Sequence, residues 1–154
     1  ASISPVRSLT VGFNAAYTNV KVESLTVPAG LPSTIALGEG QINKYSPSFS
    51  GTASVSWTLP IRPADGDVVV NADLFMTDDF GGQNGEKLPG YQLANARLDW
   101  RGIGGTGLDL GIYVKNLFNE KYVSASSVLL PSFPTSSVYA GDPRTWGVTA
   151  KYTF

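Results

Sequence analysis

The sequence predicts an all-β protein, an antiparallel meander of about six long transmembrane strands. Three observations support this prediction. Apolar and polar residues alternate with a period of two, the alternating stretches run for about 10–13 residues, and the connections between them are alternately long and short. Strands of globular proteins average about 5–6 residues. By contrast, ten residues at roughly 3.3 Å each, tilted by about 40°, cover the ~25 Å apolar band of an outer-membrane barrel.

The purest alternation lies in residues 48–59, which we predict to be one strand. It separates into an apolar face (Phe49, Gly51, Ala53, Val55, Trp57, Leu59) and a hydroxyl face (Ser48, Ser50, Thr52, Ser54, Ser56, Thr58). Residues 144–154 repeat the pattern, and their apolar face carries Trp146, Val148, Ala150, Tyr152 and Phe154. Neither stretch fits the 3.6-residue period of a helix.

Four further stretches alternate less purely and are also predicted to be strands: residues 8–22, 67–77, 91–101 and 108–118. Each has one face rich in aliphatic, alanine or aromatic residues, and we predict no helix. The opposite faces carry the polar residues Asn71, Asp73, Asn95, Arg97, Asp99, Arg101 and Lys115.

The connections divide into two classes. Residues 23–47, 78–90 and 119–143 are long or intermediate, whereas 60–66 and 102–107 are short, the former with an Asp65-Gly66 turn signal. Outer-membrane barrels place long loops outside the cell and short turns in the periplasm, so the chain is expected to end on the periplasmic side. Residues 102–107 match G-x-G-x-x-G, but a strand pattern follows, so turn glycines are expected rather than a dinucleotide site.

Composition excludes several functional classes. Without cysteine or histidine, the chain cannot form a disulfide, a thiolate or imidazole metal site, or a Ser-His-Asp triad, and we expect neither an enzyme nor a cofactor. The net charge of −1 argues against a nucleic-acid-binding protein, which typically carries an excess of basic residues. No EF-hand calcium loop surrounds Asp78-Asp79, so no metal site is predicted there. Because the chain begins without a methionine or signal segment, we expect a processed chain or a piece of a longer one.

Alternation alone also fits a soluble β-sandwich, whose apolar face points into a core. Long strands, a charged fraction of only 15%, and hydroxyls where a soluble surface would carry lysine and glutamate favour the membrane. Aromatic residues near the strand ends resemble interfacial girdles: Tyr17, Trp57, Trp100, Tyr113, Trp146, Tyr152 and Phe154. The sandwich, binding sugar or protein, stays open as an alternative.

Three segments resemble one family. Lys115-Asn116-Leu117-Phe118-Asn119-Glu120-Lys121-Tyr122-Val123 is similar to the NLF-x-x-x-Y stretch near the end of TonB-dependent outer-membrane receptors. Residues 140–154, with Gly141-Asp142-Pro143-Arg144, resemble that family's closing strand, and residues 88–98 resemble its penultimate-hairpin entry. The three occur in the family's order over nearly the whole chain.

The resemblance implies that residues 1–154 are the C-terminal segment of a barrel of about 22 strands in the outer membrane of a Gram-negative bacterium. The plug domain and about sixteen earlier strands would lie outside this chain, as would the contact with the TonB complex. The implied cargo is a small molecule such as a siderophore, cobalamin, haem or a carbohydrate. A porin or adhesin without energy coupling is the alternative among membrane proteins.

Three groups of residues are candidate sites. Trp146, Val148, Ala150, Tyr152 and Phe154 resemble the signal read by the barrel assembly machinery, or simply face lipid. The polar residues Asn71, Asp73, Asn95, Arg97, Asp99 and Lys115 are expected to line a wet wall, pairing between neighbouring strands, or to contact a plug. In the long loops, the aromatic residues Tyr45, Phe80, Tyr122, Phe133 and Tyr139 are candidate cargo contacts.

Overall fold

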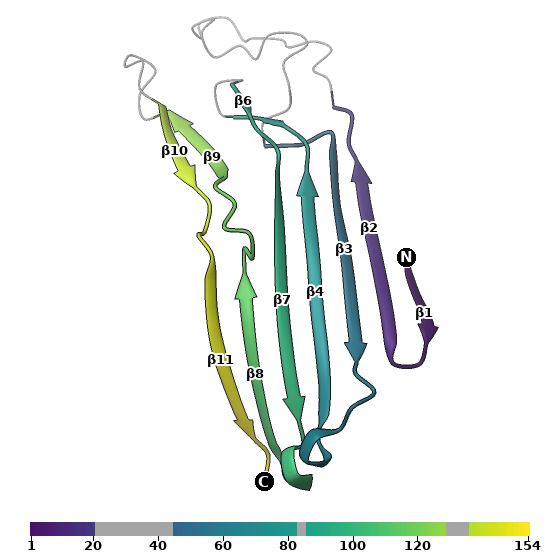
Figure 1. The fold of residues 1–154 in the computed structure, drawn as a ribbon. Helices are drawn as coiled ribbons and strands as arrows, with labels where there is room; N and C mark the ends of the chain where they lie inside the picture. Colours follow the sequence, from purple (N-terminus) through teal and green to yellow (C-terminus); the bar gives the residue numbers. More distant parts are fainter. Residues whose placement is uncertain (21–44, 83–85, 129–135) are drawn as a thin grey trace, which may run out of the picture.

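The structure is a computed structural model that describes residues 1–20, 45–82, 86–128 and 136–154. Its main element is a seven-stranded antiparallel sheet in which neighbouring strands follow one another along the chain (Figure 1). The strands are, in spatial order, β1 (Ser2–Val6), β2 (Leu9–Tyr17), β3 (Phe49–Thr58), β4 (Asp67–Thr77), β7 (Tyr91–Arg101), β8 (Leu108–Lys115) and β11 (Thr145–Tyr152). The predicted antiparallel meander is therefore confirmed.

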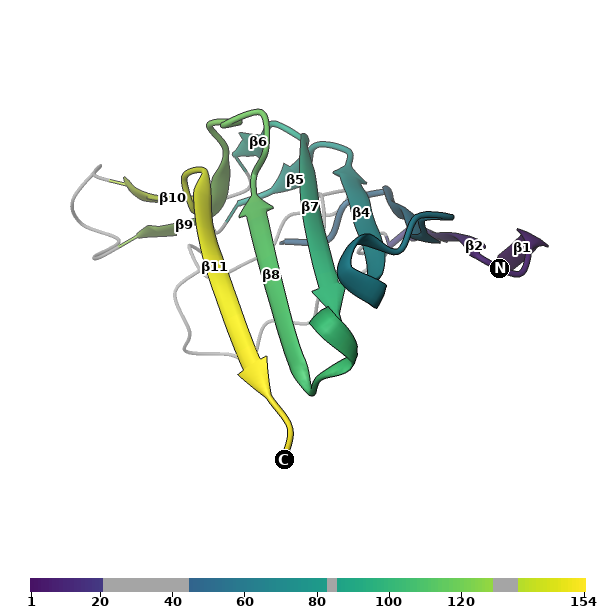
Figure 2. The same ribbon diagram turned by 60° about the horizontal axis from the view of Figure 1, so that its bottom comes forward.

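The two ends of the sheet differ, as the alternating connection lengths predict. At the short-turn rim, single-turn 3₁₀ helices join the strands, η2 (Pro63–Asp65) between β3 and β4 and η3 (Ile103–Gly105) between β7 and β8. The opposite, long-loop rim carries two small hairpins, β5 (Phe80–Gly81) with β6 (Lys87–Leu88) and β9 (Val123–Val128) with β10 (Ser136–Ala140). The chain ends at the short-turn rim (Figure 1), and the β9–β10 hairpin projects on the β11 side (Figure 2). No helix within the described ranges is long and apolar enough to span a membrane.

The strand register keeps the two faces of the sheet chemically distinct. Pairs directly opposite each other on one face are apolar throughout, including Val55 with Ala72, Val70 with Leu98, Leu98 with Ile112, and Ile112 with Val148. Because successive side chains in a strand point to opposite sides, this register leaves the hydroxyl and charged residues together on the other face.

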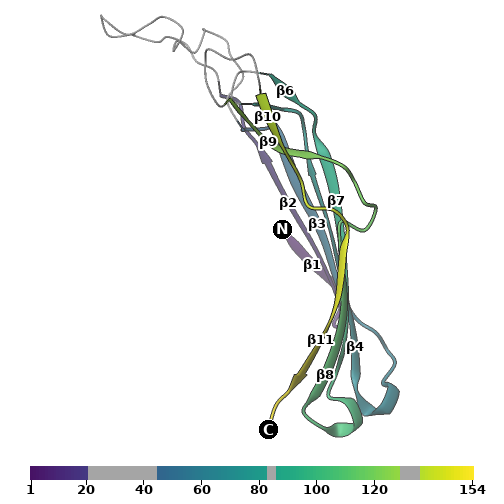
Figure 3. The same ribbon diagram turned by 90° about the vertical axis from the view of Figure 1, so that its left-hand side faces the viewer.

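The sheet is a single twisted layer, seen edge-on in Figure 3. Its apolar face is uncovered: Trp57 is 42% and Val148 73% exposed. The hydrophobic side chains buried among the described residues are Val68, Val69, Phe80 and Leu88, so no second sheet packs on that face to make a sandwich core. The observed division of residues between the two faces therefore agrees with the expected one, and the apolar face is uncovered.

Three strand boundaries differ from the sequence prediction. Residues 2–6, which contain Pro5 and were not predicted as a strand, form β1 at the edge of the sheet, where a missing N–H is tolerated. The first predicted strand, 8–22, ends at Tyr17. The strand predicted to reach Phe118 ends at Lys115, because Asn116 and Asn119 take left-handed conformations (φ 50° and 54°) that a strand cannot contain.

Candidate functional site

The polar face gathers the residues predicted to line an interior. The register places Asn71 of β4 opposite Arg97 of β7, and Asp73 opposite Asn95. The Asn95 amide donates to Asp73 Oδ2 at 2.8 Å, while its Oδ1 accepts the Asn116 N–H at 3.0 Å. One amide therefore links β4 and β7 to the chain that leaves β8.

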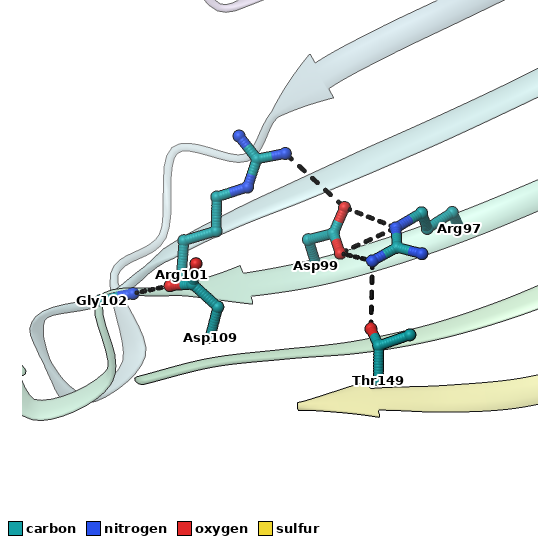
Figure 4. Close-up of polar contacts among 6 residues, drawn as sticks. All are labelled: Arg97, Asp99, Arg101, Gly102, Asp109 and Thr149. Atoms are coloured by element: carbon teal, nitrogen blue, oxygen red, sulfur yellow. Dashed lines mark hydrogen bonds and ion pairs between the residues drawn. The ribbon is translucent and has the colours of Figure 1, made fainter. Parts of the chain in front are cut away.

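Asp99 is the centre of the charged cluster on this face (Figure 4). It is 8% exposed, and Arg97 donates to both of its oxygens from Nε, at 2.9 and 3.0 Å, and approaches again through Nη2 at 2.7 Å. Arg101 Nη2 lies 3.6 Å from Asp99 Oδ2. Two guanidinium groups and one carboxylate leave the cluster with one excess positive charge.

The sequence predicted that polar residues of this face pair between neighbouring strands, but the Arg97–Asp99 ion pair lies within one strand. Arg97 and Asp99 pair with each other along β7, because residues i and i+2 of a strand share a face. The register instead sets Asn71 and Tyr113 opposite Arg97.

The cluster extends across β8 to β11. Arg97 Nη2 donates to Thr149 Oγ1 at 3.1 Å (Figure 4). Both atoms lie next to Gly111 of the intervening strand β8. A Cβ at Gly111 would lie 2.6 Å from Asp99 Oδ1, 2.7 Å from Thr149 Oγ1 and 2.9 Å from Arg97 Nη2. Gly111 has no positive φ, so the glycine is required by space rather than by backbone conformation.

Tyr113 makes a similar contact with a glycine of β11, Gly147, which lies two residues before Thr149. It is the register partner of Gly147 in β11, and its ring lies over that glycine, so that a Cβ there would sit 2.7–2.9 Å from the ring and hydroxyl. Tyr113 therefore points to the polar face and is not part of an outer aromatic girdle. Trp100, near the end of β7, does bond at the short-turn rim, donating its Nε1–H to Pro63 O at 3.0 Å.

At the short-turn rim, the G-x-G-x-x-G segment forms a turn, as predicted. Gly102, Gly104 and Gly105 have φ of 65–70°, conformations open to glycine. The Gly102 N–H donates to Asp109 Oδ1 at 2.9 Å (Figure 4), and β8 follows directly.

At the long-loop rim, Asn116 joins two of the segments that carry the family resemblance. It is 4% exposed; its Nδ2 donates to Glu120 O at 2.9 Å and Asp142 O at 3.0 Å, and its Oδ1 accepts the Glu120 N–H at 2.8 Å. Asn119 Oδ1 accepts the Arg144 N–H at 3.2 Å. The NLF turn and the segment before β11 are thereby fixed to each other.

An aromatic cluster lies beside Asn116. Tyr91 stacks on Tyr122 at 4.3 Å between ring centroids and also contacts Phe75 at 5.9 Å and Phe80 at 6.4 Å. Tyr122 lies against Gly141, and its hydroxyl accepts the Asp142 N–H at 3.3 Å. Phe80 is buried and offers little surface to a cargo, while Tyr122 keeps a half-exposed ring.

The other candidate loop aromatics have different environments. Tyr45 connects three loops: its N–H donates to Gly81 O at 2.7 Å, and its hydroxyl donates to the carbonyl of the buried Ser126. Tyr139 in β10 is 55% exposed and remains open to a ligand. Phe133 lies outside the described residues.

An exposed ion pair closes the 78–90 loop. Lys87 Nζ lies 2.6 Å from Asp79 Oδ2, and the Gly90 N–H donates to Asp79 Oδ1 at 2.7 Å. The Lys87 hydrogen bond, then that of Gly90, lowers the pKa of Asp79, and the Asp79 hydrogen bond raises the pKa of Lys87. Among the described residues, no group of three carboxylates could hold a metal ion.

The residues predicted as an assembly signal lie on or directly after β11, which pairs only with β8 in the described sheet. Trp146 is 75%, Val148 73% and Tyr152 56% exposed; Phe154 is fully exposed, 5.0 Å from the Tyr152 ring. In the sequence, Asn116 stands out only as part of a motif and no role is predicted for it. The pairing of Gly111 and Gly147 with their large neighbours is not predicted either, because alternation does not reveal which glycine a neighbouring side chain crosses.

Comparison with known proteins gives matches in structure but not in sequence. No family model and no curated protein sequence matches the chain. The siderophore receptor PiuA from Acinetobacter baumannii superposes with a TM-score of 0.72 at 14% identity over 97% of this chain. The unliganded ferric citrate transporter FecA gives 0.65 at 21% over 94%, and the ferric yersiniabactin uptake receptor FyuA from Yersinia pestis gives 0.68 at 13% over 97%.

The match covers 20% of the PiuA chain and 21% of each of the other two, so this chain spans about a fifth of the length of those receptors. In each of the three receptors, the aligned region includes nearly all of this chain. An uncovered apolar face is also what the wall of a membrane barrel presents to lipid. Residues 1–154 therefore have the fold of a barrel fragment of TonB-dependent outer-membrane receptors.

Proposed function

We propose that this chain forms part of the wall of an outer-membrane receptor that imports a small-molecule cargo by TonB-dependent active transport in a Gram-negative bacterium. The observation that supports this most strongly is the separation of the two faces over all seven strands. The exposed apolar face, with Val148 at 73%, suits hydrocarbon, and the face around Asp99 suits a wet interior.

The barrel would be completed by strands outside this chain, because β1 and β11 each have a single neighbour in the described sheet. Unpaired backbone groups cost several kcal/mol each in lipid, so both edges need partners. In our proposal the same polypeptide supplies those strands and a plug, and the plug makes the contact with the TonB complex.

The structural neighbours support one class of cargo in this proposal. PiuA is described as a siderophore receptor, FecA as a ferric citrate transporter and FyuA as a ferric yersiniabactin receptor. This supports a ferric chelate over cobalamin, haem or a carbohydrate. Cargo would meet the long-loop rim, where Tyr139 and the half-exposed Tyr122 are accessible.

Two measurements test the proposal in the intact receptor. A single cysteine at Tyr139 should react with an impermeant maleimide added to whole cells, whereas one at Ile61, in the short connection, should react only after lysis. Residues 1–154 contain no native cysteine, and any cysteine elsewhere in the receptor is first replaced by serine. Equal labelling at both positions in intact cells contradicts the orientation.

Uptake of radiolabelled ferric chelates should stop when the proton-motive force is collapsed or TonB is deleted. Uptake that persists without either would favour a porin-like barrel without energy coupling. Labelling that fits the topology, together with energy-independent uptake, therefore identifies the alternative function on the same fold.

We further propose that the exposed stripe Trp146, Val148, Ala150, Tyr152 and Phe154 is read by the barrel assembly machinery. A strand with an unpaired edge can be recognised by strand addition. Phe154→Ser should reduce insertion in cells more than refolding in detergent, while Thr153→Ala should change neither. Equal losses in cells and in detergent would indicate a lipid-facing role alone.

A further inference from the structure

The apolar–polar alternation leaves one ambiguity about β11. Shifting β11 along β8 by one residue would turn every apolar side chain of β11 to the polar side. A shift by two residues keeps both faces intact and moves the strand by about 6.6 Å, because each residue rises roughly 3.3 Å. Patterning therefore does not distinguish Ile112 opposite Val148, the observed pair, from Leu110 or Val114 opposite Val148.

Two rows of side chains on the polar face do make this distinction. In one row Asp99, Gly111 and Thr149 lie opposite one another across β7, β8 and β11. In the next row Arg97, Tyr113 and Gly147 do the same. Each row contains one glycine at the place where a larger neighbour crosses the strand.

We propose that these two rows act as a register key for β11: Arg97 and Asp99 reach Thr149 over Gly111, and Tyr113 fills the space over Gly147. The key does not depend on which cargo the receptor imports. Arg97, Tyr113 and Thr149 are positioning residues in this inference.

The key fits only the observed register. After a shift of two residues in one direction, Tyr113 would oppose Thr149, whose Cβ would occupy the space that Gly147 leaves for the ring. After a shift in the other direction, Tyr113 would oppose Thr145, Gly147 would oppose Gly111, and Thr149 would move out of reach of Arg97 toward Asp109. The first shifted register therefore loses the ring contact, and the second loses both the ring contact and the hydrogen bond.

The rim offers a competing explanation, since Asn116 and Asn119 bond to Asp142 and Arg144 just before β11 begins. If those contacts alone set the register, the polar-face key would be dispensable. An experiment must therefore separate the two.

Cysteine cross-linking of the intact receptor, in its outer membrane, makes this separation. Val148→Cys is combined in turn with Ile112→Cys, Leu110→Cys and Val114→Cys, which report the observed and the two shifted registers. Only directly opposite pairs bring Cα atoms within the roughly 4.4–6.8 Å that a disulfide requires. Inserted protein is selected by its heat-modifiable mobility, so variants that fail to fold do not contribute.

With native key residues, only the Ile112–Val148 pair should cross-link. Removing the key by Arg97→Ala with Tyr113→Ala should produce cross-links at a shifted pair, whereas Asn116→Ala with Asn119→Ala should keep the native pair. Tyr113→Phe, which retains the ring, and Thr149→Ser, which retains the hydroxyl, should also keep it. A native pattern in the Arg97/Tyr113 variant, or a shift only when the rim residues are removed, overturns the proposal.

Discussion

Arg97 in β7 donates a 3.1 Å hydrogen bond to the hydroxyl of Thr149 in β11, reaching over an intervening strand at Gly111. The bond is possible because Gly111 contributes no side chain to the polar face. It gives β11 a contact with a strand to which its backbone is not paired.

Gly111→Ala is therefore expected to destabilise the sheet. Its methyl would lie 2.6–2.9 Å from three polar atoms that are themselves bonded together, so they must separate. We expect a loss of about 1–3 kcal/mol, measured by urea unfolding of the intact receptor in detergent. Gly12→Ala is the matched control, because its Cβ meets chiefly the Ser54 hydroxyl, which can rotate away; equal losses in the two variants would contradict the argument.

Val148→Arg tests which face meets lipid. If Val148 lies near the middle of the bilayer, the substitution should cost about 2–4 kcal/mol in unfolding measurements in lipid vesicles. Ser54→Arg, on the polar face and opposite Asp73, should cost little because the guanidinium meets water and a carboxylate. A small effect at Val148 with a large one at Ser54 would mean that the faces are reversed.

Asn116→Ala should loosen the long-loop rim. It removes three hydrogen bonds to backbone groups around a side chain that is 4% exposed, at an expected cost of about 1–3 kcal/mol. Limited proteolysis between Glu120 and Asp142 should become faster. Asn119→Ala shares the left-handed backbone but loses one exposed contact, so it should change proteolysis less; the reverse order would exclude Asn116 as the hub.

The Asp79–Lys87 pair should make the 78–90 loop sensitive to pH. Because the folded pKa of Asp79 is below its usual 3.8, its contribution is present above that value and is lost as pH falls below it. Because the pKa of Lys87 is raised above 10.5, its contribution is present below that value and is lost as pH rises through the raised pKa. The loop should thus be held closed between about pH 4 and pH 10.

Hydrogen exchange of the Gly90 amide, which donates to Asp79, reports this closure. Corrected for intrinsic rates, its protection should fall at both ends of the range. Asp79→Asn should abolish the dependence, whereas Asp78→Asn should leave it. An unchanged profile in Asp79→Asn would assign the dependence to another group.

Tyr45→Phe should uncouple the long loops from one another with little effect on global stability. The phenol is exposed by 44%, but its hydroxyl bonds to Ser126 in the third loop while its backbone holds Gly81 in the second. Hydrogen exchange should increase around residues 123–127 and less around 80–82, because the backbone bond from residue 45 to Gly81 is retained in the variant. Tyr139→Phe serves as the control, and matching changes in both would show that the Tyr45 hydroxyl makes no special link.

Sequence alone was sufficient for the meander, the facing of the strands and the two classes of rim, because alternation and connection length report these directly. It did not predict β1, which is too short for alternation to be recognised and contains Pro5. It also did not predict the end of β8, which the left-handed backbone conformation of Asn116 sets rather than a change in polarity. The partner of Arg97 was not predicted correctly. Alternation predicts which residues share a face of the sheet, but it does not predict which of them a flexible side chain contacts.

The uncovered outer face has a consequence for how such a protein can change over time. In a close-packed protein core, each buried side chain must fit the shape of its neighbours. Lipid chains are fluid and can pack against apolar side chains of many shapes. In the proposed barrel, most positions on the apolar face can therefore change freely among aliphatic and aromatic residues. This freedom is consistent with backbones that still superpose at a TM-score of 0.72 when only 14% of the residues are identical.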